Sequence, residues 1–159
     1  MEYRSSWPQF AGPNLEIAFM KSAPPPDILF HHEPRLMVYR PRGVLNEHRV
    51  NAIIAFLEKE EDDAEKPFDR FTDLSKVDAL ALDVNAVIRI SLYRRLAYGN
   101  YPPVKSAFYA TDGTAASLVK VHVLLTNHSP IKARLYHTME ECAKWLGVSQ
   151  EILEYESTR

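Results

Sequence analysis

Apolar residues along the chain follow two different periods, and the change from one period to the other separates its first elements. The runs 28–32 and 36–39 are short and apolar. Between them, Pro34 favours a reversal of the chain, so the two runs predict a β-hairpin. The next apolar residues no longer form short runs, which indicates that a different kind of element follows.

A helix is predicted to begin just after Asn46. Four apolar residues then fall at the i, i+3, i+4, i+7 spacing of one helical face: Val50, Ile53, Ile54 and Leu57. The Asn46 side chain can accept a hydrogen bond from a first-turn amide, and Leu45 stands at the staple position before it. The helix is expected to end within the acidic segment 58–66, because negative charge at a helix C-terminus opposes the macrodipole. We expect that segment to be a solvated connector, with an acidic docking patch as the alternative.

From residue 68 onward the pattern alternates between strand and helix. The predicted strands are 68–77, 104–111 and 131–137, and the predicted helices are 84–98, 115–127 and 139–147. Strands that alternate with helices of this length indicate crossover units and a largely parallel sheet. In the last helix, Thr138 and Glu141 form a capping-box pattern and Gly147 stands at the C′ position. The helix at 84–98 carries apolar residues around much of its circumference, which favours an oligomer contact.

The proline run at 23–26 separates an N-terminal arm from the rest of the chain, because it can neither continue a helix nor donate ladder hydrogen bonds. We therefore predict an arm at 1–26, a single domain at 27–148 and a C-terminal tail at 149–159. The arm contains several aromatic residues, which favours docking of the arm on the domain or on a second subunit.

Composition narrows the function classes. Nineteen basic and 21 acidic residues leave a formal charge of −2, without the basic excess expected of a nucleic-acid binder. Cys142 is the single cysteine, which excludes an internal disulfide framework and fits a reducing cytoplasm. No stretch approaches the roughly 20 apolar residues of a membrane span. We expect a soluble cytoplasmic protein that does not span a membrane.

The motifs of catalysis and cofactor binding are missing from the sequence. The five glycines are scattered and form no phosphate-binding loop, and no serine stands in a nucleophile elbow. Cys142 shares an apolar helix face and is expected to pack in the core. His31 and His32 are adjacent in a strand and so point to opposite faces. We therefore predict no catalytic residue, no metal site and no cofactor.

Five polar residues form the candidate binding site. Asp73 and Ser75 close a central strand at the edge where α/β folds place their sites. Asp83 stands at the start of the next helix, where it can be an N-cap or a fixed negative docking charge. Asn85 and Arg89 are four residues apart on that helix and can hold one polar ligand together. The alternative for this pair is a hydrogen-bonded pair on the surface.

The chain resembles the SpoIIAA-like branch of the STAS superfamily over residues 27–148. The resemblance rests on Gly43 before the first helix, on the Asp-Leu-Ser stretch at 73–75, and on the pattern of the last strand and helix. The residues of that last pattern are Tyr136, Glu140, Glu141, Ala143, Trp145 and Leu146. The resemblance implies an α/β fold with a mixed sheet, in which an N-terminal hairpin is followed by alternating strands and helices.

This resemblance also bears on function. Anti-sigma-factor antagonists of the superfamily carry an Asp-Ser-Ser-Gly motif whose serine is phosphorylated. The corresponding stretch here, 79–87, has no serine, and Asp83 occupies about that position. The sequence therefore predicts a noncatalytic regulatory or protein-interaction domain that forms a homodimer, without phosphoregulation at the usual serine. The alternative is a domain that binds a small apolar or anionic ligand.

Overall fold

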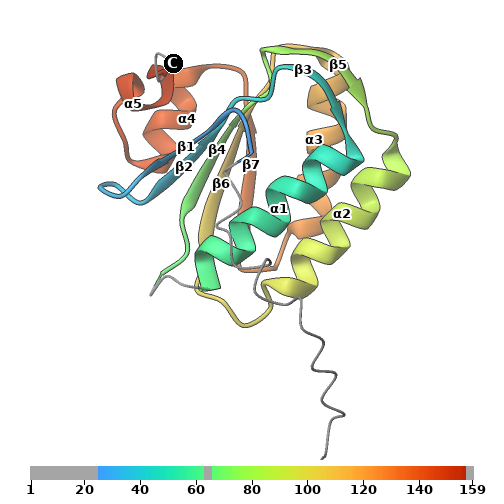
Figure 1. The fold of residues 1–159 in the computed structure, drawn as a ribbon, viewed down its shortest axis with the longest axis horizontal. Helices are drawn as coiled ribbons and strands as arrows, with labels where there is room; N and C mark the ends of the chain where they lie inside the picture. Colours follow the sequence, from blue (N-terminus) through green and yellow to red (C-terminus); the bar gives the residue numbers. More distant parts are fainter. Residues whose placement is uncertain (1–24, 63–65, 157–159) are drawn as a thin grey trace, which may run out of the picture.

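The computed structural model describes residues 25–62 and 66–156, which form a five-stranded sheet with helices on both faces (Figure 1). The strands are β1 (Ile28–His31), β2 (Leu36–Tyr39), β3 (Gly43–Asn46), β4 (Asp69–Asp73), β5 (Val77–Ala81), β6 (Val104–Tyr109) and β7 (Ile131–Tyr136). The helices are α1 (Glu47–Asp62), α2 (Val84–Ala97), α3 (Gly113–Thr126), α4 (Met139–Leu146) and α5 (Gln150–Glu154). Figure 1 shows α1, α2 and α3 on one face of the main sheet and α4 and α5 on the other.

The main sheet is mixed, as predicted. Its order is β1-β2-β4-β6-β7. The β1–β2 hairpin is antiparallel, with Ile28 opposite Tyr39, and the remaining neighbours pair in parallel. The predicted hairpin and the alternation of strands and helices after it are therefore confirmed.

A second, two-stranded sheet departs from the prediction. The run 68–77, predicted as one strand, is divided between β4 and β5, because the Asp73 carboxylate accepts hydrogen bonds from the Ser75 amide and hydroxyl and so bends the chain. After this turn, β5 pairs in parallel with β3, which was not predicted. Figure 1 shows this small sheet beside the beginnings of α1 and α2.

Helix caps follow the sequence signals closely. Asn46 Oδ1 accepts a hydrogen bond from the Arg49 amide at 2.9 Å. In α4, the Thr138 hydroxyl accepts from the Glu141 amide and donates to its carboxylate, and Gly147 takes a left-handed conformation with φ of 74°. These contacts confirm the predicted N-cap at Thr138, with Glu141 as its partner, and the C′ glycine.

The acidic segment 58–66 differs from the prediction, because its first five residues belong to α1. The helix continues to Asp62, and Glu61 is buried, with 4% of its surface exposed. Glu61 forms an ion pair with Arg70 of β4. The prediction of a solvated connector is therefore wrong at Glu61, because a buried cation compensates the acidic charge that sequence reasoning had assigned to solvent.

Two apolar cores lie on the opposite faces of the sheet, and the alternation of strand residues separates them. In β2, Leu36 and Val38 pack with α4 and α5, whereas Met37 and Tyr39 pack with α1 and α3. The α4 core includes Leu153 of α5, which is fully buried. The packed body therefore includes α5, within the segment assigned from sequence to a tail, whereas the predicted arm lies almost wholly outside the described residues.

Within the described part of the chain, no helix has both the length and the apolar character needed to cross a membrane.

Candidate ligand-binding cavity

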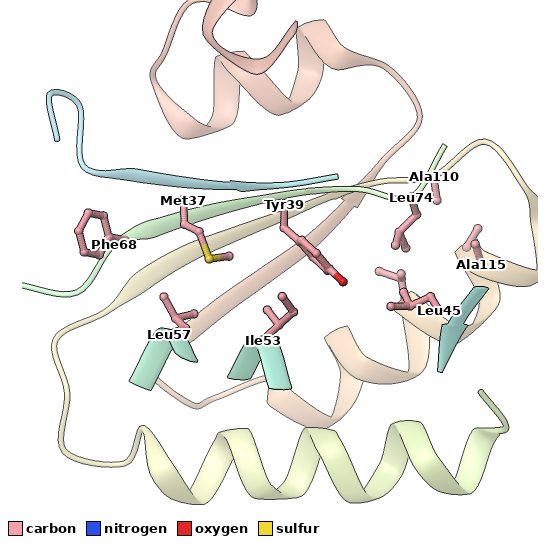
Figure 2. Close-up of a cluster of buried hydrophobic side chains, with 11 residues drawn as sticks. Met37, Tyr39, Leu45, Ile53, Leu57, Phe68, Leu74, Ala110 and Ala115 are labelled. Carbon is pink, nitrogen blue, oxygen red and sulfur yellow. The ribbon is translucent and has the colours of Figure 1, made fainter. Parts of the chain in front are cut away.

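A partly enclosed cavity of about 160 Å³ lies between the main sheet and helices α1, α2 and α3. Apolar side chains from β2, β3, β5 and all three helices form most of its wall. Figure 2 shows Met37 and Tyr39 projecting from the sheet towards Ile53 and Leu57 of α1, with Leu45 of β3 beyond them. Because protein interiors are usually close-packed, a cavity of this size is an unusual feature of a small domain.

Strand alternation and register create the floor of this cavity. Parallel pairing aligns Met37 with Arg70 and Arg70 with Ser106, and it aligns Tyr39 with Thr72 and Thr72 with Phe108. Residues two apart on a strand share a face, so both cross-strand rows point away from α4. All six of these residues line the cavity: Met37, Tyr39, Arg70, Thr72, Ser106 and Phe108.

Two buried arginines contribute to one part of the cavity wall. Arg70 and Arg94, on β4 and α2, both line it and are 4% and 5% exposed. Arg70 Nη2 donates to Glu61 Oε1 at 2.7 Å and also to the Tyr98 hydroxyl. The Arg70 and Arg94 guanidinium carbons lie 4.7 and 4.6 Å from the centroid of the Tyr98 ring. The two cations therefore share one aromatic partner at the C-terminal end of α2.

The positive charge of Arg94 is less well compensated by acidic partners than that of Arg70. Its Nη1 lies 3.5 Å from Glu58 Oε1, close enough for an ion pair, but without a hydrogen bond. Burial, followed by the positive charge of Arg70, lowers the pKa of Arg94 to about 9. Carboxylates Glu61 and Glu58 oppose this shift without cancelling it.

His122 of α3 is the third ionisable residue in the wall. Burial, followed by the charges of Arg94 and Arg70, lowers its pKa to about 4, so its ring is neutral at pH 7. Its Nδ1 lies 2.8 Å from Ser91 Oγ. Because the Ser91 hydroxyl donates to the Val87 carbonyl, His122 Nδ1 is the donor in this contact.

The five residues singled out from the sequence do not line this cavity, and they lie in separate places. Asp73 and Ser75 are joined by hydrogen bonds of 2.9 and 2.6 Å, as their proximity in sequence predicts. Asp73 lies two residues after Phe71, which packs on the α4 side, and its carboxylate is 4.0 Å from Arg40. Its side chain therefore belongs to the sheet face opposite the cavity.

The other three candidates lie on α2. Asp83 is its N-cap and accepts from the Ala86 amide at 2.7 Å, as predicted. Arg89 pairs with Glu47 of α1 through two hydrogen bonds, of 3.1 and 2.8 Å, rather than with Asn85. Asn85 is exposed. The structure thus brings Asp73 and Ser75 together and leaves Asp83, Asn85 and Arg89 outside that pair.

Sequence reasoning missed Arg70, Arg94 and His122. A signal for two of them was present: Arg94 falls seven residues after Val87 on the buried stripe of α2, and Arg70 stands two residues after Phe68, and so on the same face, in the predicted strand. A charge on an apolar face requires a buried partner or a ligand. Among the described residues, no group of three or more His, Cys, Asp or Glu side chains is placed to hold a metal ion.

The chain is an α/β domain with a pocket between its main sheet and α1–α3. A solved structure described as an uncharacterized protein of the DUF3478 family with a SpoIIAA-like fold, from Shewanella loihica PV-4, is similar to this chain with a TM-score of 0.50. The two chains are 16% identical, and the match covers 75% of this chain and 90% of the other. This similarity confirms the predicted fold.

No family model and no curated protein matches the sequence.

Proposed function

We propose that this protein is a noncatalytic domain that binds a small molecule in the cavity between the sheet and α1–α3. The observation that carries the proposal is the cavity itself, about 160 Å³ with mostly apolar walls and a few polar groups. This combination is typical of small-molecule sites. An apolar cavity of about 150 Å³ in another protein accepts benzene, so the available space is sufficient for a ligand of that bulk.

Two observations support binding without catalysis. Cys142 is fully buried, and burial, with the nearby charges of Glu141 and Asp73, raises the pKa of its thiol to about 12. At neutral pH it is therefore a thiol rather than a nucleophilic thiolate. The Ser91 hydroxyl donates its proton to a backbone carbonyl, so His122 does not serve as its base.

The proposal is tested by filling the cavity. Val119 of α3 is 6% exposed and lines the cavity, whereas Leu124 of the same helix is 73% exposed. We expect amide NMR shifts on titration with benzene to map to the cavity in the wild type and in Leu124→Phe. Val119→Phe should abolish them because the added ring occupies the same space.

Circular dichroism and thermal unfolding are used first to establish that both variants are folded. Benzene shifts that are absent from the wild type, or that persist unchanged in a folded Val119→Phe, contradict the proposal.

A second candidate function is the predicted homodimer or protein-interaction surface on α2. Leu92, Tyr93 and Leu96 are 44%, 52% and 81% exposed on this helix, and exposed apolar side chains of this size favour a contact. Analytical ultracentrifugation at high concentration should then show a dimer that Leu96→Asp dissociates. A strict monomer in the wild type argues against a homodimer.

Localisation in the cytoplasm remains a prediction that fits the single cysteine.

A further inference from the structure

His122 of α3 gives the cavity wall an uncharged hydrogen-bond acceptor. The Ser91 hydroxyl donates to the Val87 carbonyl at 2.7 Å, so it accepts from His122 Nδ1, which lies 2.8 Å away. The single proton of the neutral ring is therefore on Nδ1, and Nε2 carries a lone pair. Nothing in the described part of the chain hydrogen bonds with Nε2. A ligand with a donor group completes this position.

A molecule in the cavity can reach this part of the wall. His122 lines the cavity and is only partly buried, so some of its surface remains accessible. Its ring packs edge-to-face with Phe108 of the cavity floor, with the ring centroids 5.4 Å apart. Thr72 pairs with Phe108 across the strands, and Ser106 precedes Phe108 by two residues on the same face. Uncharged polar groups of three residues therefore gather around Phe108 in a mostly apolar wall.

The charged groups beside the cavity are paired with one another. Arg70 Nη2 donates to Glu61 Oε1 at 2.7 Å, and Arg94 Nη1 lies 3.5 Å from Glu58 Oε1. The atoms of these four side chains that lack a hydrogen bond are enclosed by the protein and have almost no accessible surface. A charged group on a ligand would therefore be buried without a partner, at a large cost in free energy. The cavity favours an uncharged ligand.

The rest of the wall sets the size of the ligand. Ile53, Leu57, Val87 and Val119 are among the apolar side chains that line the remaining space. A cavity of about 160 Å³ takes a single six-membered ring with one small substituent.

We infer that the ligand is a small uncharged ring compound with a hydroxyl group, of which phenol is the simplest aromatic example. Its hydroxyl donates to His122 Nε2, and its ring lies among the apolar side chains. This inference rests on the proposed function and names the chemical class of its ligand.

Three probes of similar size test it on the unmodified protein at pH 7. Toluene has the shape of phenol without the hydroxyl, and benzoate carries a full negative charge. Phenol and toluene should both bind, with affinities within about tenfold of each other, because the hydrogen bond to Nε2 offsets the cost of desolvating the hydroxyl. Benzoate should bind more weakly than phenol. Amide NMR titration measures all three.

Two histidine variants locate the hydroxyl of the ligand. His122→Phe keeps an aromatic ring and removes the acceptor, so it should lower phenol affinity about 10- to 100-fold and leave toluene affinity nearly unchanged. His48→Phe is the matched control, since His48 is exposed on α1, and it should change neither affinity.

A spectroscopic measurement on the wild type does not depend on whether His122→Phe folds. The long-range ¹H–¹⁵N spectrum of the imidazole rings should show His122 with a proton on Nδ1 and a bare Nε2. Phenol should move the Nε2 resonance upfield because this nitrogen then accepts a hydrogen bond, whereas toluene should leave it nearly in place.

The outcomes separate this inference from the proposal beneath it. Toluene binding without phenol binding, or benzoate binding more tightly than phenol, overturns the hydroxyl inference and leaves small-molecule binding intact. An unmoved Nε2 resonance in the phenol complex, or equal losses of phenol and toluene affinity in a folded His122→Phe, overturns it as well. If phenol, toluene and benzene all fail to bind, both proposals fail.

Discussion

Arg70 is a charged side chain inside a sheet strand, and its partner Glu61 comes from the last turn of α1. Their atoms Nη2 and Oε1 are 2.7 Å apart, and the two side chains are 5% and 2% exposed. A buried pair of this kind is costly to desolvate, so its presence is weak evidence for stability. It is stronger evidence that breaking the pair on one side harms the fold.

Removing Glu61 alone should therefore destabilise the protein more than removing both charges. We expect Glu61→Leu to lower the free energy of unfolding by about 3–5 kcal/mol, because it leaves Arg70 buried without its carboxylate. The double variant Glu61→Leu, Arg70→Met should recover most of that loss. Urea unfolding measures both, and a double variant as unstable as the single one contradicts this account.

His122 makes stability depend on pH. Its pKa is lowered from 6.5 to about 4 in the folded protein. Between these two pH values His122 is therefore protonated in the unfolded chain and neutral in the folded chain. The stabilising effect of this group is thus fully present above pH 6.5 and is lost as the pH falls towards 4. We expect the loss to be on the order of 3 kcal/mol between pH 8 and pH 4.

The measurement is urea unfolding of the wild type and of His122→Gln across that range. Glutamine does not titrate, so the variant should lose less stability on acidification by about the same amount. Parallel pH profiles for the two proteins contradict the assignment. Arg94 and Arg70 are the charges that act on His122, and neither changes its charge between these pH values.

At the scale of elements, two glycines at helix ends play opposite parts. Gly147 ends α4 with φ of 74°, while Gly113 is the first residue of α3, and a methyl group would meet nothing within 4 Å at either position. Gly147→Ala should therefore cost about 1–2 kcal/mol through backbone strain alone. Gly113→Ala should be neutral or stabilise by up to about 1 kcal/mol. Thermal unfolding tests both, and equal effects contradict the explanation.

The elements themselves were largely predictable because their signals are local. The caps at Asn46 and Thr138, and the apolar periods between them, depend on residues within a few positions of one another. The pairing of β3 with β5 was not predictable in this way, since it joins two short segments across the whole of α1 and β4. The turn at Asp73 that separates β4 from β5 was visible in the sequence only as a polar interruption.

The candidate site was missed for a related reason. The sequence drew attention to Asp73 and Ser75 because ligands of α/β folds usually lie at the carboxyl ends of the strands. Arg70 stands near the beginning of β4, at the opposite end, and Arg94 in the last turn of α2. Their significance depends on Glu61, and only the folded chain brings these three residues together.

At the scale of the whole molecule, α5 contributes to the same apolar core as α4. Leu153 is fully buried against this core, whereas Leu124 of α3 is 73% exposed. Leu153→Ala should lower the free energy of unfolding by about 2–5 kcal/mol, and Leu124→Ala should change it by no more than about 0.5 kcal/mol. Chemical denaturation measures both. A negligible effect at Leu153 would mean that α5 does not contribute to the stability of the domain.

The order of strands in the main sheet also governs how quickly the chain can reach this structure. Among the described strands of that sheet, β1 and β2 are the pair joined by a short reversal, so their pairing closes the shortest loop. The pairing of β2 with β4 closes a loop that contains β3 and α1, and each later parallel pairing closes a loop that contains another helix. Closing these long loops costs entropy before any contact compensates it. Refolding should therefore be slower than that of a helical bundle of equal length, and the newly made β2 edge should remain exposed until β4 has been synthesised.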